Sequence, residues 1–274
     1  MKAMIFAAGV GSRLGEITRS TPKALVDIGG TTPLKLAVER LSQYGFNEIV
    51  VNIHHHAEMM AMEIKKLSKH PVTLTLSDES DGLLDTGGGL FKARQFFDDQ
   101  PFILYNVDII NSIDLGKLYN FHLRKGGLAT LAVRHRSGNR FLLVDKEGSL
   151  QGWTNRKTGK SILVDDERNE RNERNEPKDP NDRNKQNKQN KRNKLNDRDE
   201  QNERNDLKEV AFSGIHVASP EIFNHMQEGT YSMISLYLTL LAKGRINTFL
   251  DDTGYCYDIG SPEKLEEVRK FMQG

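Results

Sequence analysis

The chain has 274 residues, a length that suits one large α/β domain or two small ones. It carries 39 basic and 38 acidic side chains, and the formal net charge of +1 argues against a broad basic surface for nucleic acid or an anionic membrane. The single cysteine, Cys256, excludes an intrachain disulfide and suits a reducing cytoplasm. No apolar stretch approaches the roughly 20 residues of a membrane span, and the N-terminus is too short in apolar residues for a signal peptide, so we expect a cytoplasmic protein with no membrane or nucleic-acid partner.

The first predicted element is a buried strand, formed by the apolar run 3–8. Gly9, Gly11 and Ser12 follow it directly, and such residues let the backbone approach a ligand and point amides at it. Arg13 and Lys23 add positive charge, so the simplest ligand is a polyphosphate. The alternative is an ordinary glycine-rich turn between a strand and a helix. Two common phosphate loops do not fit, because the Gly-Lys-Ser/Thr of a P-loop is absent and the dinucleotide fingerprint would need glycine at Leu14.

The next elements alternate between helices and strands. We expect a helix from Pro33 to the stop at Gly45, a strand at 48–53, a polar helix over 54–67 and a strand at 71–76. The three histidines at 54–56 invite a metal interpretation. Adjacent residues on one chain rarely point at one ion, so the pattern favours solvated histidines at a strand end.

A triple glycine follows Asp85 and Thr86 and precedes a predicted helix at 90–97. It would expose backbone at a helix N-terminus, suitable for a flat base or a phosphate, or it would form a flexible turn. The next predicted strand, 102–107, leads into Asp108. Ligands of open α/β sheets bind at the carboxyl ends of strands, where Asp108 could hold Mg²⁺ or could cap the following turn.

The second half begins with a helix at 118–125 and strands at 129–134, 141–145, up to Trp153 and 162–164. Lys157 lies in a polar turn, where it would reach a sugar phosphate or simply be exposed. After residue 209 we expect a strand at 210–217, helices from Ser219 and over 232–243, a strand at 246–250, and a short strand before a final helix. Gly214 within the first of these strands permits close approach of a ligand or of a packed helix.

Residues 165–209 differ in composition from the rest. Asparagine recurs there at every third position over long stretches, and apolar residues are almost absent. This period matches neither a helix nor a strand, and nothing is available to bury, so we predict a disordered insertion. A tail that binds nucleic acid or a protein partner is the alternative, which the nearly balanced charge disfavours.

Several of these motifs together resemble the sugar-1-phosphate nucleotidyltransferases, in the family's own order. They are Ala7-Ala8-Gly9-Val10-Gly11-Ser12-Arg13-Leu14, Thr21-Pro22-Lys23, Asp85-Thr86-Gly87-Gly88-Gly89, Asn106-Val107-Asp108 and Tyr257-Asp258-Ile259-Gly260-Ser261-Pro262-Glu263. The resemblance covers 1–164 and 210–274 and implies one α/β domain with a Rossmann-like (GT-A-like), mainly parallel mixed sheet and helices on both faces. A tryptophan is common two residues before the last aspartate, where this chain has Cys256. No hexapeptide repeat is present, so we expect no left-handed β-helix acyltransferase domain.

The resemblance also implies a reaction and its residues. A nucleotidyl group passes from an NTP to a sugar 1-phosphate, giving an NDP-sugar and pyrophosphate, with either uridylyl or guanylyl transfer. Implied alternatives are a phosphocholine-type cytidylyltransferase and a non-catalytic nucleotide-sugar-binding regulator. The implied site comprises Arg13 and Lys23 for catalysis; Ala7, Ala8, Gly9, Gly11, Ser12, Asp85, Thr86, Gly87 and Gly88 for the nucleotide; Asn106, Lys157 and Gly214 for the sugar; and Asp108 and Asp258 for Mg²⁺.

Overall fold

The computed structural model describes residues 1–164, 206–243 and 245–273. The strands are β1 (Lys2–Phe6), β2 (Glu48–Ile53), β3 (Thr73–Asp78), β4 (Phe102–Asn106), β5 (Ile109–Asn111), β6 (Ala129–Arg134), β7 (Arg140–Val144), β8 (Leu150–Asn155), β9 (Lys160–Leu163), β10 (Lys208–Ala218), β11 (Ile246–Leu250) and β12 (Cys256–Asp258). The α-helices are α1 (Ile17–Ser20), α2 (Pro33–Gln43), α3 (Ala57–Leu67), α4 (Asp85–Lys92), α5 (Leu115–Lys125), α8 (Met233–Thr239) and α9 (Pro262–Gln273). None of these helices combines the length and apolar composition that crossing a bilayer requires.

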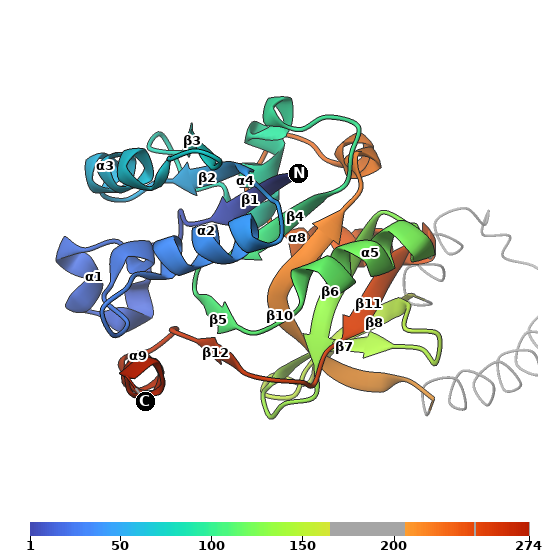
Figure 1. The fold of residues 1–274 in the computed structure, drawn as a ribbon. Helices are drawn as coiled ribbons and strands as arrows, with labels where there is room; N and C mark the ends of the chain where they lie inside the picture. The colour runs from blue at the N-terminus through green and yellow to red at the C-terminus, as the bar shows by residue number, and fades with distance from the viewer. Residues whose placement is uncertain (165–205, 244, 274) are drawn as a thin grey trace, which may run out of the picture.

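Ten of the described strands form one mixed sheet, in the order β3-β2-β1-β4-β10-β7-β8-β9, with β6 beside β10 and β11 beside β6. The four strands from β3 to β4 are parallel, whereas β10 runs antiparallel to β4 and β6. Helices lie on both faces of this sheet (Figure 1). The expected α/β architecture with a mainly parallel mixed sheet is therefore confirmed. A separate two-stranded ribbon joins β5 to β12.

The core explains why β1 is apolar after Lys2. Met4 and Phe6 belong to a cluster that α4 and α8 cover, while Ala3 and Ile5 belong to a second cluster that α2, α3 and α5 cover. A strand buried on both faces has no polar side to alternate with. A third, smaller cluster joins the first loop to the final helix; its members are Leu14, Val26, Ile28, Ile110, Ile259, Leu265 and Val268.

Local signals located several elements accurately. The side chain of Thr32 accepts a hydrogen bond from the amide of Lys35 at 3.2 Å, with Pro33 at the first helical position, so α2 begins where predicted.

The predicted helix at 54–67 begins later, at Ala57, because His56 has a left-handed backbone with φ 53°. His54 is also less solvated than expected, since its Nδ1 donates to the carbonyl of Glu79 at 2.7 Å.

The prediction of a helix at 90–97 was wrong. Helix α4 begins at Asp85, contains all three glycines and ends at Lys92, and a short 3-10 turn (Arg94–Phe96) follows. The glycines are buried because other parts of the chain pack directly against them: a Cβ on Gly88 would lie 2.0 Å from the carbonyl oxygen of Gly229, and one on Gly89 would lie 2.5 Å from Oε1 of Glu79. Tertiary packing thus overrides the cost of about 1 kcal/mol that glycine brings to a helix interior.

The predicted insertion at 165–209 lies outside the described residues up to position 205. Its expected end was wrong, because Lys208 and Glu209 already belong to β10 and pair with Val144 and Leu143 of β7. Strand pairing uses main-chain groups, so these two charged residues join the sheet despite their polar side chains.

Candidate active site

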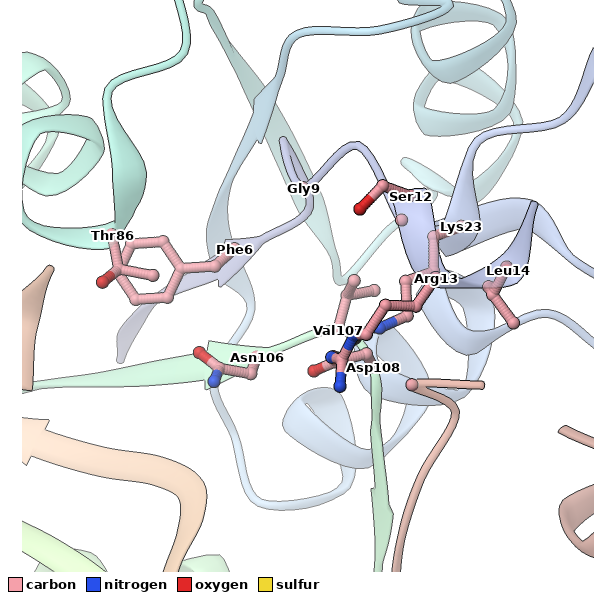
Figure 2. A pocket seen from close by; sticks show the side chains of 12 residues that line it. Phe6, Gly9, Ser12, Arg13, Leu14, Lys23, Thr86, Asn106, Val107 and Asp108 are labelled. Carbon is pink, nitrogen blue, oxygen red and sulfur yellow. Dashed lines mark hydrogen bonds and ion pairs between the residues drawn. The ribbon is translucent and has the colours of Figure 1, made fainter. Parts of the chain in front are cut away.

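A pocket of about 290 Å³ lies beyond the carboxyl ends of β1 and β4. Its lining comes from the first loop, the start of α4, the end of β4 and the turn after β12, namely Phe6, Gly9, Gly11, Ser12, Arg13, Leu14, Lys23, Thr86, Asn106, Val107, Asp108 and Gly260. Figure 2 shows the side chains of Arg13 and Lys23 directed toward Asp108, with Phe6 and Thr86 on the opposite side. This is where open α/β sheets bind ligands.

Lys23 and Asp108 form the central ion pair of this pocket. The Nζ atom of Lys23 lies 2.6 Å from Oδ2 of Asp108, and Lys23 is only 9% exposed. The first loop makes room for this lysine through Gly11, which has a φ of 68°; a Cβ there would lie 3.2 Å from Cβ of Lys23 and 2.9 Å from Cγ2 of Thr18. Glycine at position 11 therefore serves both the backbone turn and the placement of the cation.

Asp258 lies beside Asp108 because β12 pairs with β5. Asp258 is opposite Ile109 in that ribbon, and the amide of Ile259 donates to the carbonyl of Asp108 at 3.1 Å. Burial raises the pKa of Asp258, but the hydrogen bond and charge of Lys264, the amide of Gly260 and the charge of Arg136 outweigh burial and lower it below its usual value. The carboxylate is therefore ionised at neutral pH.

Arg13 lies against the turn that carries Asp258. A Cβ on Gly260 would be 3.1 Å from Nη2 of Arg13 and 2.6 Å from Oδ1 of Asp258, so both groups press on the bare backbone of this glycine. The four charged residues that the sequence singled out, Arg13, Lys23, Asp108 and Asp258, thus lie in one place. They are contributed by the first loop, the end of β4 and the end of β12.

The two carboxylates suit a hard divalent cation. Mg²⁺ in phosphoryl-transfer sites takes one or two carboxylates and completes its shell with substrate phosphates and water. Over the described ranges, no group of three or more His, Cys, Asp or Glu residues is arranged to hold a metal by itself. Asp108 and Asp258 offer the two carboxylates that such an ion takes from a protein.

Ala7 and Ala8 anchor the first loop through their backbone amides. Their amides donate to Oδ1 of Asn52 at 2.7 and 3.3 Å, and neither residue lines the pocket. These two amides are committed to the protein, whereas Gly9, Gly11 and Ser12 line the cavity.

Sequence reasoning missed the side chains that hold Asn52. Its Nδ2 donates to Oε1 of Glu79 at 2.8 Å, and the amide of Leu84 donates to Oε2 of the same carboxylate at 3.3 Å. Glu79 is fully buried, and burial raises its pKa against the lowering effect of these donors. The available signal was a polar residue near the end of the apolar strand β2 and another directly after β3.

The start of α4 does not offer free amides. Gly87 and Gly88 donate to the carbonyl of Tyr231 at 2.7 and 3.3 Å, so the expectation of exposed glycine backbone was wrong. Thr86 lines the pocket while its Oγ1 accepts from the amide of Met233 at 2.9 Å. Asp85 is exposed and has a left-handed φ of 58°.

The three residues implied for the sugar separate into two groups. Asn106 lines the pocket, and Gly214 lies close to it: a Cβ on Gly214 would be 3.3 Å from Nδ2 of Asn106 and 2.5 Å from Cγ1 of Ile109. Gly214 also has a φ of 75°, so packing and backbone both require glycine. Lys157 is exposed in the turn between β8 and β9 and does not line the pocket.

Comparison with known proteins shows which sequences this chain resembles. Relatives include N-acetylmuramate alpha-1-phosphate uridylyltransferase of Neisseria meningitidis serogroup B, 38% identical over 114 residues that cover 42% of this chain and 49% of that protein. Another, named "Probable mannose-1-phosphate guanylyltransferase 1", from Oryza sativa subsp. japonica, is 36% identical over 137 residues, 48% of this chain and 38% of that protein. The matched region thus spans less than half the length of either relative.

The fold is also similar to that of HddC from Yersinia pseudotuberculosis, with a TM-score of 0.69 at 18% identity over 98% of both chains. Residues 2–149 match the family model described as nucleotidyl transferase, which is more than half of the sequence. Arg13, Lys23 and Asp108 line the pocket, and Asp258 lies two residues before Gly260 of its lining. With this match over more than half of its length, the chain belongs to the nucleotidyl transferase family.

Proposed function

We propose that this chain transfers a nucleotidyl group from an NTP to a sugar 1-phosphate, forming an NDP-sugar and pyrophosphate. The observation that carries the proposal is that Arg13, Lys23 and Asp108 line one pocket, with Asp258 next to it on the turn that Arg13 contacts. The names of the two relatives, a uridylyltransferase and a guanylyltransferase, support uridylyl or guanylyl transfer.

The chemistry needs charge neutralisation more than proton transfer. A phosphate oxygen of the sugar 1-phosphate bonds to the α-phosphorus of the NTP, the bond from that phosphorus to the bridging α–β oxygen breaks, and pyrophosphate leaves with the electron pair. The nucleophile is already ionised, so no general base is required. The barrier is the repulsion between two anions and the charge on the leaving group, which fixed cations reduce.

The chain's own residues divide this work. Lys23, buried and anchored to Asp108, orients the α-phosphate and the incoming sugar phosphate, and Arg13 neutralises the β- and γ-phosphates. Gly9, Gly11 and Ser12 cradle the triphosphate. Thr86 borders the base, with Asp85, Gly87 and Gly88 positioning it from the start of α4, and Asn106 with Gly214 forms the sugar side.

Asp108 and Asp258 would hold Mg²⁺. When bound, the ion supplies Lewis-acid charge neutralisation between the reacting phosphates.

The test is pyrophosphate release from each of the common NTPs against glucose, mannose, N-acetylglucosamine and N-acetylmuramic acid 1-phosphates, with Mg²⁺. We expect release only when an NTP and a sugar 1-phosphate are both present. A folded protein that binds an NTP but releases no pyrophosphate with any pair would contradict the proposal and favour a nucleotide-sugar-binding regulator.

A further inference from the structure

Asp258 is surrounded by positive groups from outside the first loop. Its Oδ2 accepts a hydrogen bond from Nζ of Lys264 and lies 3.7 Å from Nη1 of Arg136, and its Oδ1 accepts from the amide of Gly260 at 3.1 Å. The two carboxylates of the site are therefore each paired with a lysine, Asp108 with Lys23 and Asp258 with Lys264.

The two pairs differ in how firmly the lysine is held. The side chain of Lys23 is 10% exposed and packs against Gly11, so it cannot leave Asp108 without opening the loop. The side chain of Lys264 is 47% exposed, although that of Asp258 is only 19% exposed. A lysine with its stem in water can rotate away from a carboxylate at little cost, because exposed ion pairs contribute little net free energy.

The position of Lys264 on α9 also indicates that its side chain is held loosely. It is the third residue of this helix, and a positive charge in the first turn opposes the helix dipole, which favours acidic residues such as the neighbouring Glu263. Lys264 therefore gains nothing from the helix, and its partner among the described residues is Asp258.

We propose that Lys264 is a displaceable counter-ion of Asp258, a positioning residue that keeps the carboxylate paired until a divalent cation takes its place. Lys264 then moves into solvent, while Lys23 remains on Oδ2 of Asp108. This inference rests on the proposed function, because the metal role of Asp258 belongs to that proposal. It predicts that Lys264 competes with the ion and weakens its binding to the nucleotide-free protein.

The experiment measures Mn²⁺ binding to the nucleotide-free full chain, by the loss of the free-ion electron paramagnetic resonance signal. Lys264→Met keeps the length of the side chain and removes its charge. We expect this variant to bind Mn²⁺ roughly two- to fivefold more tightly than the unmodified chain, the range that the loss of one exposed ion pair produces. The gain should vanish in the double variant Lys264→Met/Asp258→Asn.

Two controls separate pairing from overall charge. Lys270→Met removes the same charge from an exposed position of the same helix and should leave Mn²⁺ affinity unchanged. Lys264→Arg keeps the charge at Asp258 and should give no gain. No gain in Lys264→Met, whether both proteins bind the ion equally or neither binds it, overturns the counter-ion role. An equal gain in Mn²⁺ affinity in Lys270→Met would also overturn the counter-ion role.

Failure here is distinguishable from failure of the proposed function. If Lys264→Met shows no gain while the unmodified chain still releases pyrophosphate from an NTP and a sugar 1-phosphate, only the counter-ion role is lost. If the gain occurs but no substrate pair reacts, the exchange stands and the transfer reaction is wrong.

Discussion

The carbonyl oxygen of Asp108 accepts a 3.1 Å hydrogen bond from the amide of Ile259, although these residues belong to distant parts of the sequence. Ile259 is fully buried in the cluster that also contains Leu14 of the first loop. One apolar cluster thus joins the first loop, β5 and the turn that carries Asp258. Movement of any one of them would disturb the others.

Replacing Asp108 by Asn should abolish most of the turnover. The substitution keeps the shape of the side chain but removes the charge that pairs with Lys23 and would hold a divalent ion. We expect turnover to fall about 10²- to 10³-fold, as when a single preorganised electrostatic group is lost. Pyrophosphate release and circular dichroism measure activity and fold. Asp99→Asn, at an exposed position, is the matched control, and near-normal turnover in Asp108→Asn would remove the assignment.

Gly260→Ala tests the contact between Arg13 and Asp258. The new Cβ would lie 2.6 Å from Oδ1 of Asp258 and 3.1 Å from Nη2 of Arg13, so at least one of the two groups must move. Displacing a positioned group by about 1 Å can cost on the order of 100-fold in rate. We expect kcat to fall about 10- to 100-fold with an unchanged melting temperature.

The control for this change is Gly82→Ala, where a Cβ meets nothing within 4 Å. It should retain full activity. If Gly260→Ala is equally active, the placement of Arg13 against this turn does not matter for the reaction.

Gly88→Ala tests why the triple glycine is needed. A Cβ there would lie 2.0 Å from the carbonyl oxygen of Gly229, which belongs to backbone and cannot rotate away. Overpacking of this kind costs about 1–3 kcal/mol or more. Urea denaturation should show that loss in the free energy of unfolding even without ligand. A variant as stable as the unmodified chain would instead indicate that these glycines serve only the nucleotide.

The stability of the protein should fall as the pH is lowered from about 6.5 toward 3. Burial lowers the pKa of His216 to about 3 and that of His122 to about 4, from 6.5. The unfolded chain therefore binds protons in this interval that the folded chain does not. Each histidine can remove up to about 1.4 kcal/mol per pH unit until its folded pKa is reached.

His216→Phe should flatten this dependence. Neither ring nitrogen of His216 has a hydrogen-bond partner among the described residues, and the ring packs between Phe212 and Tyr237. A phenyl ring can keep that packing and cannot be protonated. Urea denaturation across pH 4–7 measures the slope, with the exposed His55→Gln as control. An unchanged slope in His216→Phe would assign the acid sensitivity to other groups.

Much of this protein could be predicted from local patterns. The buried strand β1, the capped helix α2 and the charged residues at loop and strand ends follow from side-chain periodicity, turn chemistry and motif order. These signals depend on neighbours a few residues apart. They were sufficient for the fold class and the family, and the four charged residues that they pointed to lie near one another in the fold.

The sequence by itself determined most of the elements, their order and the chemical groups available for binding phosphate. Only the tertiary structure decided which of these groups meet. The packing of Gly88 on Gly229, the support of the first loop by Asn52 and Glu79, and the pairing of Asp258 with Lys264 and Arg136 all join distant segments. Lys157 lies outside the pocket for the same reason, because contacts between distant segments decide where its turn is placed. Strand order and helix packing set such contacts, and no local pattern encodes them.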